Sequence, residues 1–143
     1  MARDASKALE GHCLCGRVRL RAVPEALDVD ACHCGMCRRW GGGPCLTIPC
    51  GTAVTITQDG DALTVFDSSE WAQRGFCRAC GSHLFYRLRA QGLYFVSAGV
   101  FGEVEGVVFR NEIFVDHKPG WYDFANPTRR MTGAEVVALF DGG

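Results

Sequence analysis

Apolar and polar residues alternate in short runs along much of the chain. In Arg17–Val23, RVRLRAV, every second residue is apolar, which is typical of a strand with one buried face. Similar runs recur between turn signals such as Asp59-Gly60. The further strands predicted in this way are Leu27–Cys34, Leu46–Ile48, Val54–Thr57, Leu63–Phe66, Leu84–Leu88, Leu93–Val100, Val107–Phe109 and Ile113–Val115. The expected fold class is therefore mainly β.

Two segments have a helical pattern. Gly35–Trp40 can form a turn or two of helix, and Thr132–Phe140 predicts a short C-terminal helix. Thr132 is the expected N-cap, and Glu135 three residues later completes a capping box. The residues that this helix is expected to bury are Val136, Val137, Leu139 and Phe140.

Length and charge limit the classes of protein to consider. We expect residues 1–9 to be flexible and residues 10–143 to form a single zinc-binding domain, because 143 residues with 48% apolar content suit one globular core. The N-terminus has no apolar signal region, and no apolar run approaches the ~20 residues of a membrane span, so a cytoplasmic location is expected. The net charge of −1 without a basic run argues against nucleic acid as a partner.

The cysteines are the residues that indicate a functional site in this sequence. The chain has nine cysteines, an odd number, and no secretion signal, which favours metal binding over a disulfide framework. Seven of them fall into three short motifs. These motifs are Cys13-Leu14-Cys15-Gly16, Cys32-His33-Cys34-Gly35-Met36-Cys37 and Cys77-Arg78-Ala79-Cys80-Gly81.

The first and third motifs together predict one structural zinc site. Cys13 and Cys15 point the same way if the segment is extended, and Cys77 and Cys80 form a metal knuckle whose following Gly81 permits a tight turn. Neither pair is sufficient alone, but together they supply four sulfurs. A closed four-thiolate zinc contributes directly to the free energy of folding.

The central motif predicts a second metal site with three sulfurs. Cys32 and Cys34 share a strand face, and Cys37 follows one turn later. Three protein ligands with an open fourth position are typical of a catalytic zinc. A fourth protein ligand would instead make the site structural, and the spacing leaves both readings open. The candidates for that ligand are Cys45, Cys50, His12, His33, His83 and His117.

The ligand type restricts the chemistry of an open site. Three thiolates on Zn²⁺ leave a formal charge of −1, so the metal would acidify water less than one held by neutral histidines. It would still accept a soft ligand such as a substrate sulfur. The motif therefore favours sulfur chemistry over ester or peptide hydrolysis.

The three motifs in this order resemble the glutathione-dependent formaldehyde-activating enzyme family, which shares its domain with centromere protein V. The segment Arg74–Gly81 and the tail Ile113–Trp121 also resemble that family. The resemblance implies an Mss4-like β fold with two zinc ions, and it favours the open form of the second site. It implies a structural zinc at Cys13, Cys15, Cys77 and Cys80 and a catalytic zinc at Cys32, Cys34 and Cys37.

The activity that the resemblance implies is that of a carbon–sulfur lyase joining formaldehyde and glutathione into S-hydroxymethylglutathione. The expected partner is then a small thiol such as glutathione. The alternative is a zinc-stabilised binding module without enzymatic activity. Methionine sulfoxide reduction is a weaker third hypothesis, which would need Cys45 or Cys50 as a nucleophile outside the metal sites.

The remaining candidates each have a structural and a functional interpretation. His33 lies between two ligands and should point away from the metal. Cationic side chains near the motif can bind the carboxylates of glutathione or lie in solvent, and these are Arg38, Arg39 and Lys118. Trp71 and Trp121 are expected in the core or at its edge. Cys45 and Cys50 are expected to be small buried apolar residues.

Overall fold

The computed structural model describes residues 7–141, which form two compact units. Unit 1 contains the described residues up to Leu27 together with Thr47–Val107. Unit 2 contains Asp28–Leu46 together with the described residues from Val108 onward. No helix within residues 7–141 combines the length and the apolarity that a membrane crossing requires.

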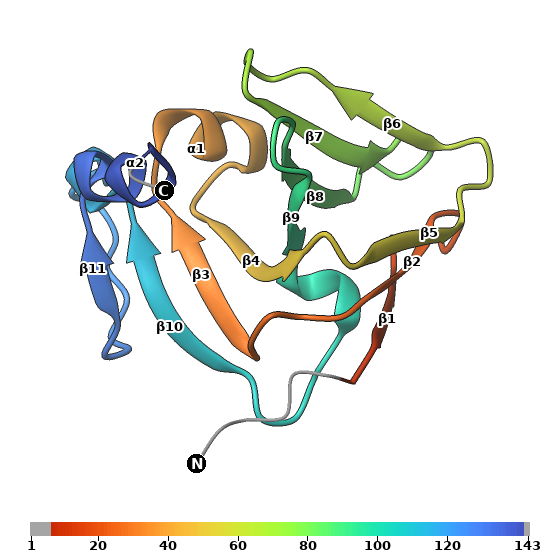
Figure 1. Cartoon of the computed structure of the whole chain (residues 1–143), viewed down its shortest axis with the longest axis horizontal. Coiled ribbons are helices and arrows are strands. Elements are labelled where there is room, and N and C mark those ends of the chain that lie inside the picture. The colour runs from red at the N-terminus through yellow and green to blue at the C-terminus, as the bar shows by residue number, and fades with distance from the viewer. Residues whose placement is uncertain (1–6, 142–143) are drawn as a thin grey trace. The chain divides into compact units, whose positions relative to one another are not determined.

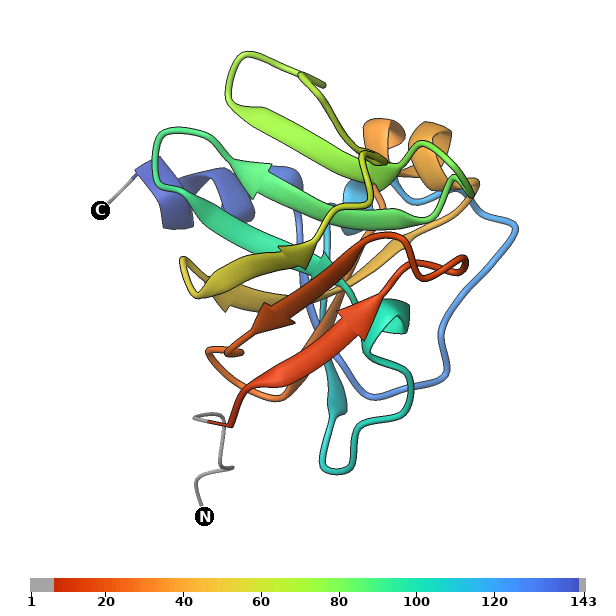
Figure 2. The same ribbon diagram turned by 90° about the vertical axis from the view of Figure 1, so that its right-hand side faces the viewer.

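Unit 1 is built from antiparallel strands. A three-stranded sheet has the order β1 (Leu9–His12), β2 (Arg19–Ala22) and β5 (Val54–Gln58), and Figure 2 shows β1 beside β2. A longer run has the order β4 (Cys45–Gly51), β9 (Leu93–Ser97), β8 (His83–Leu88), β7 (Ala72–Cys77) and β6 (Leu63–Phe66), with β4 pairing to β9 from Thr47 onward. A 3₁₀ turn, η1 (Ala98–Phe101), follows β9. The largest fully buried apolar side chains of this unit are Leu20, Ile48, Leu84, Val18 and Val96.

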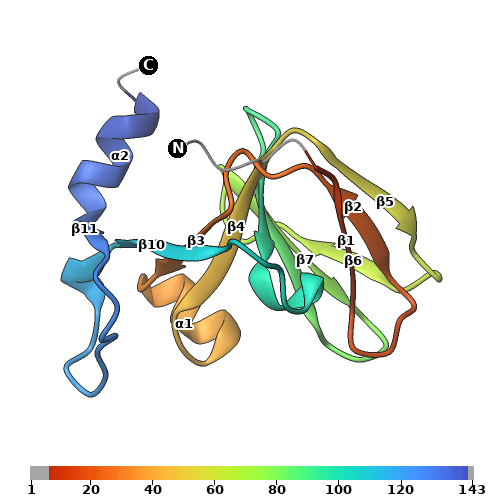
Figure 3. The ribbon, with the colours of Figure 1, turned by 90° about the horizontal axis from the view of Figure 1, so that it is seen from below.

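Unit 2 has three parallel strands with β10 (Val108–Ile113) between β3 (Asp28–Cys32) and β11 (Arg129–Met131) (Figure 1). Its other elements are α1 (Gly35–Gly41), the 3₁₀ turn η2 (Val115–His117) and α2 (Gly133–Asp141). Figure 3 shows α1 and α2 on opposite sides of these strands. The pairing of Ile113 with Cys32 places the end of β10 beside the start of the central cysteine motif.

The mainly β prediction is confirmed, and so are both predicted helices. The capping box of α2 forms as expected, because Glu135 N donates to Thr132 Oγ1 at 3.2 Å and Thr132 N donates to Glu135 Oε1 at 3.0 Å. The burial predicted for α2 is wrong in part. Val136 is buried, whereas the side chains of Val137, Leu139 and Phe140 are 44–59% exposed.

Three strands were not predicted, because their sequences lack a run of β-branched residues. β1 is short and polar, β11 contains two arginines, and β7 carries Gly75 at a position where a larger residue would be expected. Residues 1–6 of the segment predicted to be flexible lie outside the described residues, while Leu9 begins β1. The single domain over residues 10–143 stays a prediction.

The prediction of two strands at 107–109 and 113–115 is also wrong, because β10 runs unbroken through its polar centre. Each polar side chain there has a partner within unit 2. Asn111 Nδ2 donates to Asp30 Oδ1 at 2.8 Å, Arg110 Nε lies 3.5 Å from Asp28 Oδ1, and Glu112 is bound to His33. The chain then turns at Phe114, whose φ of +57° is left-handed, and the segment predicted as a strand becomes η2.

Candidate metal centres

The sulfurs of Cys13, Cys15, Cys77 and Cys80 converge in unit 1, and all lie within 4.8 Å of one another. Cys13 Sγ and Cys15 Sγ are 3.6 Å apart, and Cys15 Sγ and Cys77 Sγ are 3.8 Å apart. A tetrahedral zinc with Zn–S bonds of about 2.3 Å separates its sulfurs by about 3.8 Å. The four thiols therefore fit a structural zinc in both ligand type and spacing.

Two glycine-ended turns bring these four cysteines together. The extended conformation considered for Cys13 and Cys15 is not present. Both residues lie in the turn between β1 and β2, where Gly16 N donates to Cys13 O at 3.1 Å. The second pair forms the same kind of turn, with Gly81 N donating to Cys77 O at 2.7 Å. Gly16 and Gly81 have φ angles of +80° and +78°, which glycine adopts without the steric cost of a Cβ.

Ser82 links the two turns. Its Oγ accepts a hydrogen bond from Leu14 N at 2.9 Å and lies 3.2 Å from Cys80 Sγ. This hydroxyl, followed by the backbone N–H groups of Ser82 and Cys15, lowers the pKa of Cys80 to about 5. The surroundings of Cys80 thus favour the thiolate, which is the form that binds a metal.

The sulfurs of Cys32, Cys34 and Cys37 form a second cluster in unit 2, also within 4.8 Å of one another. Cys32 ends β3, Cys34 is the N-cap of α1, and Cys37 lies in the first turn of that helix, where its N–H donates to Cys34 Sγ at 3.4 Å. Hydrogen bonds with the Cys34 and Cys37 thiols, together with burial, raise the pKa of Cys32. Three thiolates in this space would repel one another, so the cluster suits a bound cation.

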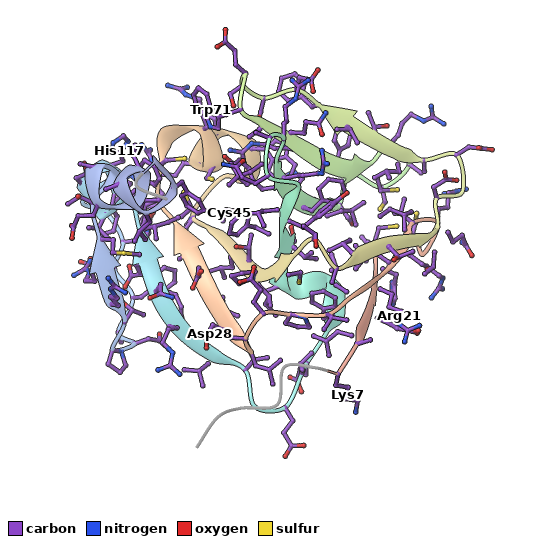
Figure 4. All side chains as sticks on the ribbon, viewed as in Figure 1. Lys7, Arg21, Asp28, Cys45, Trp71 and His117 are labelled. Atoms are coloured by element: carbon purple, nitrogen blue, oxygen red, sulfur yellow. The ribbon has the colours of Figure 1, made fainter. Side chains whose placement is uncertain are left out.

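Among the side chains of residues 7–140, no fourth ligand atom from His, Cys, Asp or Glu joins this cluster. Cys50 is buried in unit 1, and its Sγ donates to Ile48 O at 3.3 Å. Cys45, labelled in Figure 4, begins β4 and is half-buried outside both clusters. The other sequence candidates are His12, which is hydrogen-bonded to Cys13 O, the partly buried His83, and His117, which stacks edge-on against Phe114.

His33 is fully buried and cannot serve as that ligand. Its Nε2 lies 2.8 Å from Glu112 Oε1, and its Nδ1 lies 2.6 Å from Tyr122 Oη. Thr128 Oγ1 also donates to the Glu112 carboxylate, which is itself 1% exposed. The prediction that His33 points away from the metal agrees with these contacts, because both ring nitrogens are occupied.

An open cavity of about 220 Å³ lies beside the three-sulfur cluster. Its lining consists of Gly35, Arg38, Arg39, Gly42 and Trp121. Gly35 follows Cys34 in the chain, and Arg38 follows Cys37, so one wall of the cavity is the helix that carries two of the three sulfurs.

The structure narrows the expectations for three further side chains. Trp121 is 72% exposed and Trp71, labelled in Figure 4, is 59% exposed, so neither is a core residue. Lys118 is not a solvated surface charge, because its side chain is only 10% exposed. Its Nζ lies 2.8 Å from Asp123 Oδ1 and donates to the backbone oxygens of Pro119 and Tyr122. Lys118 therefore stabilises its own loop and has no donor left for a substrate.

The family model for the glutathione-dependent formaldehyde-activating enzyme matches residues 8–117. The chain belongs to this family. An uncharacterized lyase of Schizosaccharomyces pombe is 33% identical over 129 residues, which cover 90% of this chain and 93% of the relative. A Halomonas elongata protein that carries the family's name is 26% identical over 131 residues and 80% of each chain.

A solved structure has a similar fold. The crystal structure of a Rhodobacter sphaeroides protein superposes with a TM-score of 0.57 at 25% identity, covering 70% of this chain and 91% of that one. The mainly β fold of this family member is therefore also that of an experimentally determined protein.

Sequence reasoning missed three polar residues that support the two clusters in this family member. Ser82 follows the third cysteine motif, and a serine directly after a metal knuckle is the one signal that could have indicated it. Glu112 and Tyr122 had no such signal, because their contacts with His33 span 79 and 89 residues of chain.

Proposed function

We propose that this protein is a carbon–sulfur lyase that forms and cleaves the adduct of a thiol and an aldehyde. The observation that carries the proposal is the cluster of Cys32, Cys34 and Cys37, which no fourth side-chain ligand from residues 7–140 completes. Three protein ligands and one open position are typical of catalytic zinc. The family name supports glutathione and formaldehyde as the substrates.

The proposed reaction adds a thiol across a carbonyl group. A sulfur–carbon bond and an O–H bond form, while the S–H bond and the carbonyl π bond break, so that the proton moves from sulfur to oxygen. The product is a hemithioacetal, which with formaldehyde is an S-hydroxymethyl thiol adduct. Zinc bound at Cys32, Cys34 and Cys37 would supply a Lewis acid that accepts soft sulfur ligands. The chain's own contribution is to hold the three thiols in place and to keep His33 away from the open position.

In this proposal the four-sulfur cluster has a structural role. Cys13, Cys15, Cys77 and Cys80 provide a full tetrahedral set, which leaves no position for a substrate. Zinc at this cluster would stabilise the fold by joining the β1–β2 turn to the end of β7. The cofactor requirement is then two zinc ions per chain, one for each cluster.

The test compares variants of the two clusters. Exchange between free formaldehyde and its glutathione adduct is followed by NMR with zinc-loaded protein, after correction for the uncatalysed rate. Cys34→Ser should remove the acceleration and one zinc per chain while the circular dichroism spectrum is kept. Cys77→Ser should instead unfold the protein, because it opens the structural site.

Two results would contradict the proposal. If wild-type protein binds two zinc ions but does not accelerate exchange with any thiol, the binding module without enzymatic activity becomes the better interpretation. If Cys34→Ser unfolds the protein as completely as Cys77→Ser, the three-sulfur cluster is structural as well.

A further inference from the structure

The cavity beside the three-sulfur cluster is lined by cationic and aromatic side chains. Two of its five residues are arginines and one is an exposed tryptophan, while no acidic residue contributes to it. Glycine at positions 35 and 42 keeps side chains out of the space, and a Cβ added at Gly42 would meet nothing within 4 Å. The cavity is therefore open, cationic and bounded by an aromatic ring.

Neither arginine is neutralised by a carboxylate among the described residues. Arg38 uses Nε to donate to His33 O at 3.0 Å, and its two terminal nitrogens have no acceptor among the described side chains and backbone groups. Arg39 is exposed, and its side chain makes no hydrogen bond or ion pair with the described residues. By contrast, Arg89, Arg110 and Arg130 each lie within 4.0 Å of a carboxylate oxygen.

His33 contacts Arg38 on one side of this cavity and Tyr122, the neighbour of Trp121, on the other. Its backbone oxygen fixes Arg38, and its ring binds the Oη of Tyr122, which follows Trp121 directly in the chain. The rings of Trp121 and Tyr122 are in contact, with centroids 4.8 Å apart. Because His33 is in turn anchored by the buried Glu112, the arginine and tryptophan walls are positioned before any ligand arrives.

We propose that this cavity binds a carboxylate arm of the thiol substrate, so that the enzyme selects thiols that carry a carboxylate. The inference rests on the proposed function and adds the substrate class and the residues that recognise it. A guanidinium pairs well with a planar carboxylate, and two unpaired guanidiniums favour an anion over a neutral or cationic thiol. The volume of about 220 Å³ is below the roughly 300–1,000 Å³ of a site for a whole small molecule. The cavity therefore binds only the carboxylate-bearing arm of the substrate, while the thiol group of the substrate reaches the three-sulfur cluster.

The test measures binding to zinc-loaded protein by calorimetry with two probes, glutathione and its dimethyl ester. Wild-type protein should bind glutathione about tenfold more tightly than the ester, which is the order of one charge-assisted hydrogen bond. Arg39→Gln should weaken the binding of glutathione about tenfold and leave the binding of the ester unchanged. The matched control is Arg110→Gln, an exposed arginine of the same unit outside the cavity, which should alter neither affinity.

Equal affinity of wild-type protein for the two probes would overturn the carboxylate site. An equal loss of affinity for both probes in the Arg39→Gln variant would overturn it as well. The NMR exchange assay separates this outcome from failure of the proposed function. Acceleration of exchange without a preference for glutathione over its ester contradicts the carboxylate site alone. A preference in binding without any acceleration supports the site and contradicts the lyase.

Discussion

His33 Nε2 and Glu112 Oε1 lie 2.8 Å apart, and both side chains are buried. His33 stands between two cysteines of the central motif, and Glu112 comes from the neighbouring parallel strand β10. This pair turns the imidazole away from the sulfurs and connects the motif to the loop that carries Trp121. The buried contacts of His33 with Glu112 and Tyr122 therefore keep its imidazole from binding a metal at the three sulfurs.

Loss of the Glu112 carboxylate should destabilise the protein. Glu112→Ala leaves the buried His33 ring without a hydrogen-bond partner at Nε2, and a buried polar group left in this state costs about 1–3 kcal/mol of unfolding free energy. Urea denaturation followed by circular dichroism measures the change. Glu105→Gln at an exposed position is the control and should be neutral. A loss below about 1 kcal/mol for Glu112→Ala would show that the pair is not important for stability.

Removal of the Ser82 hydroxyl should weaken metal binding at the four-sulfur cluster. Ser82→Ala deletes the group that lowers the pKa of Cys80 and that also accepts from Leu14 N. Loss of a hydrogen-bond partner of a metal ligand typically reduces affinity about 10–100-fold.

Zinc competition with a chelator, performed in the Cys34→Ser background, isolates the four-sulfur cluster in this experiment. Ser69→Ala is the matched control, because its hydroxyl accepts from Ala72 N away from the metal ligands. Equal zinc affinities for the two serine variants would mean that the Ser82 hydroxyl does not tune the site.

The burial of Cys50 should make the unfolding free energy fall as the pH becomes alkaline. Burial, and after it the charge of Glu25, raises the pKa of Cys50 to about 12 from an ordinary value of 9.0. The unfolded chain loses this proton at lower pH than the folded chain does. The resulting stability is therefore fully present below pH 9 and is lost as the pH rises toward 12.

The Cys50→Ala variant provides the comparison for that titration. Its unfolding free energy, measured in urea between pH 8 and pH 11, should fall less steeply than that of wild type, since one raised thiol pKa is removed. Parallel pH profiles for the two proteins would indicate that Cys50 ionises as readily in the folded state as in the unfolded one.

Gly75 in β7 should not tolerate even a methyl group. A Cβ at this position would lie 2.3–2.8 Å from the ring carbons of Phe85, which is itself 3% exposed and has no room to move. Overpacking of this kind costs about 1–3 kcal/mol, so Gly75→Ala should lower the midpoint of thermal unfolding. Gly43→Ala has open space around the new methyl group and is the control. Equal midpoints for the two variants would contradict the close packing of Phe85 on β7.

The sequence by itself determined the parts of this protein whose residues are close together in the chain. Each metal motif spans six residues or fewer, so its spacing alone indicated which sulfurs can meet, and Thr132 and Glu135 are three residues apart in the capping box. The alternating runs likewise predicted most strands, because the strand period is a local property. The joining of Cys13 and Cys15 with Cys77 and Cys80 was predicted from the need for four ligands.

Only the tertiary structure decided which distant residues support those motifs. Parallel pairing of β10 with β3 brings Glu112 to His33, and a loop 89 residues away supplies Tyr122. The same loop uses Lys118 internally and leaves Trp121 exposed beside two unpaired arginines. Strand register and loop conformation depend on the packing of the whole unit, so no local pattern in the sequence could indicate these contacts.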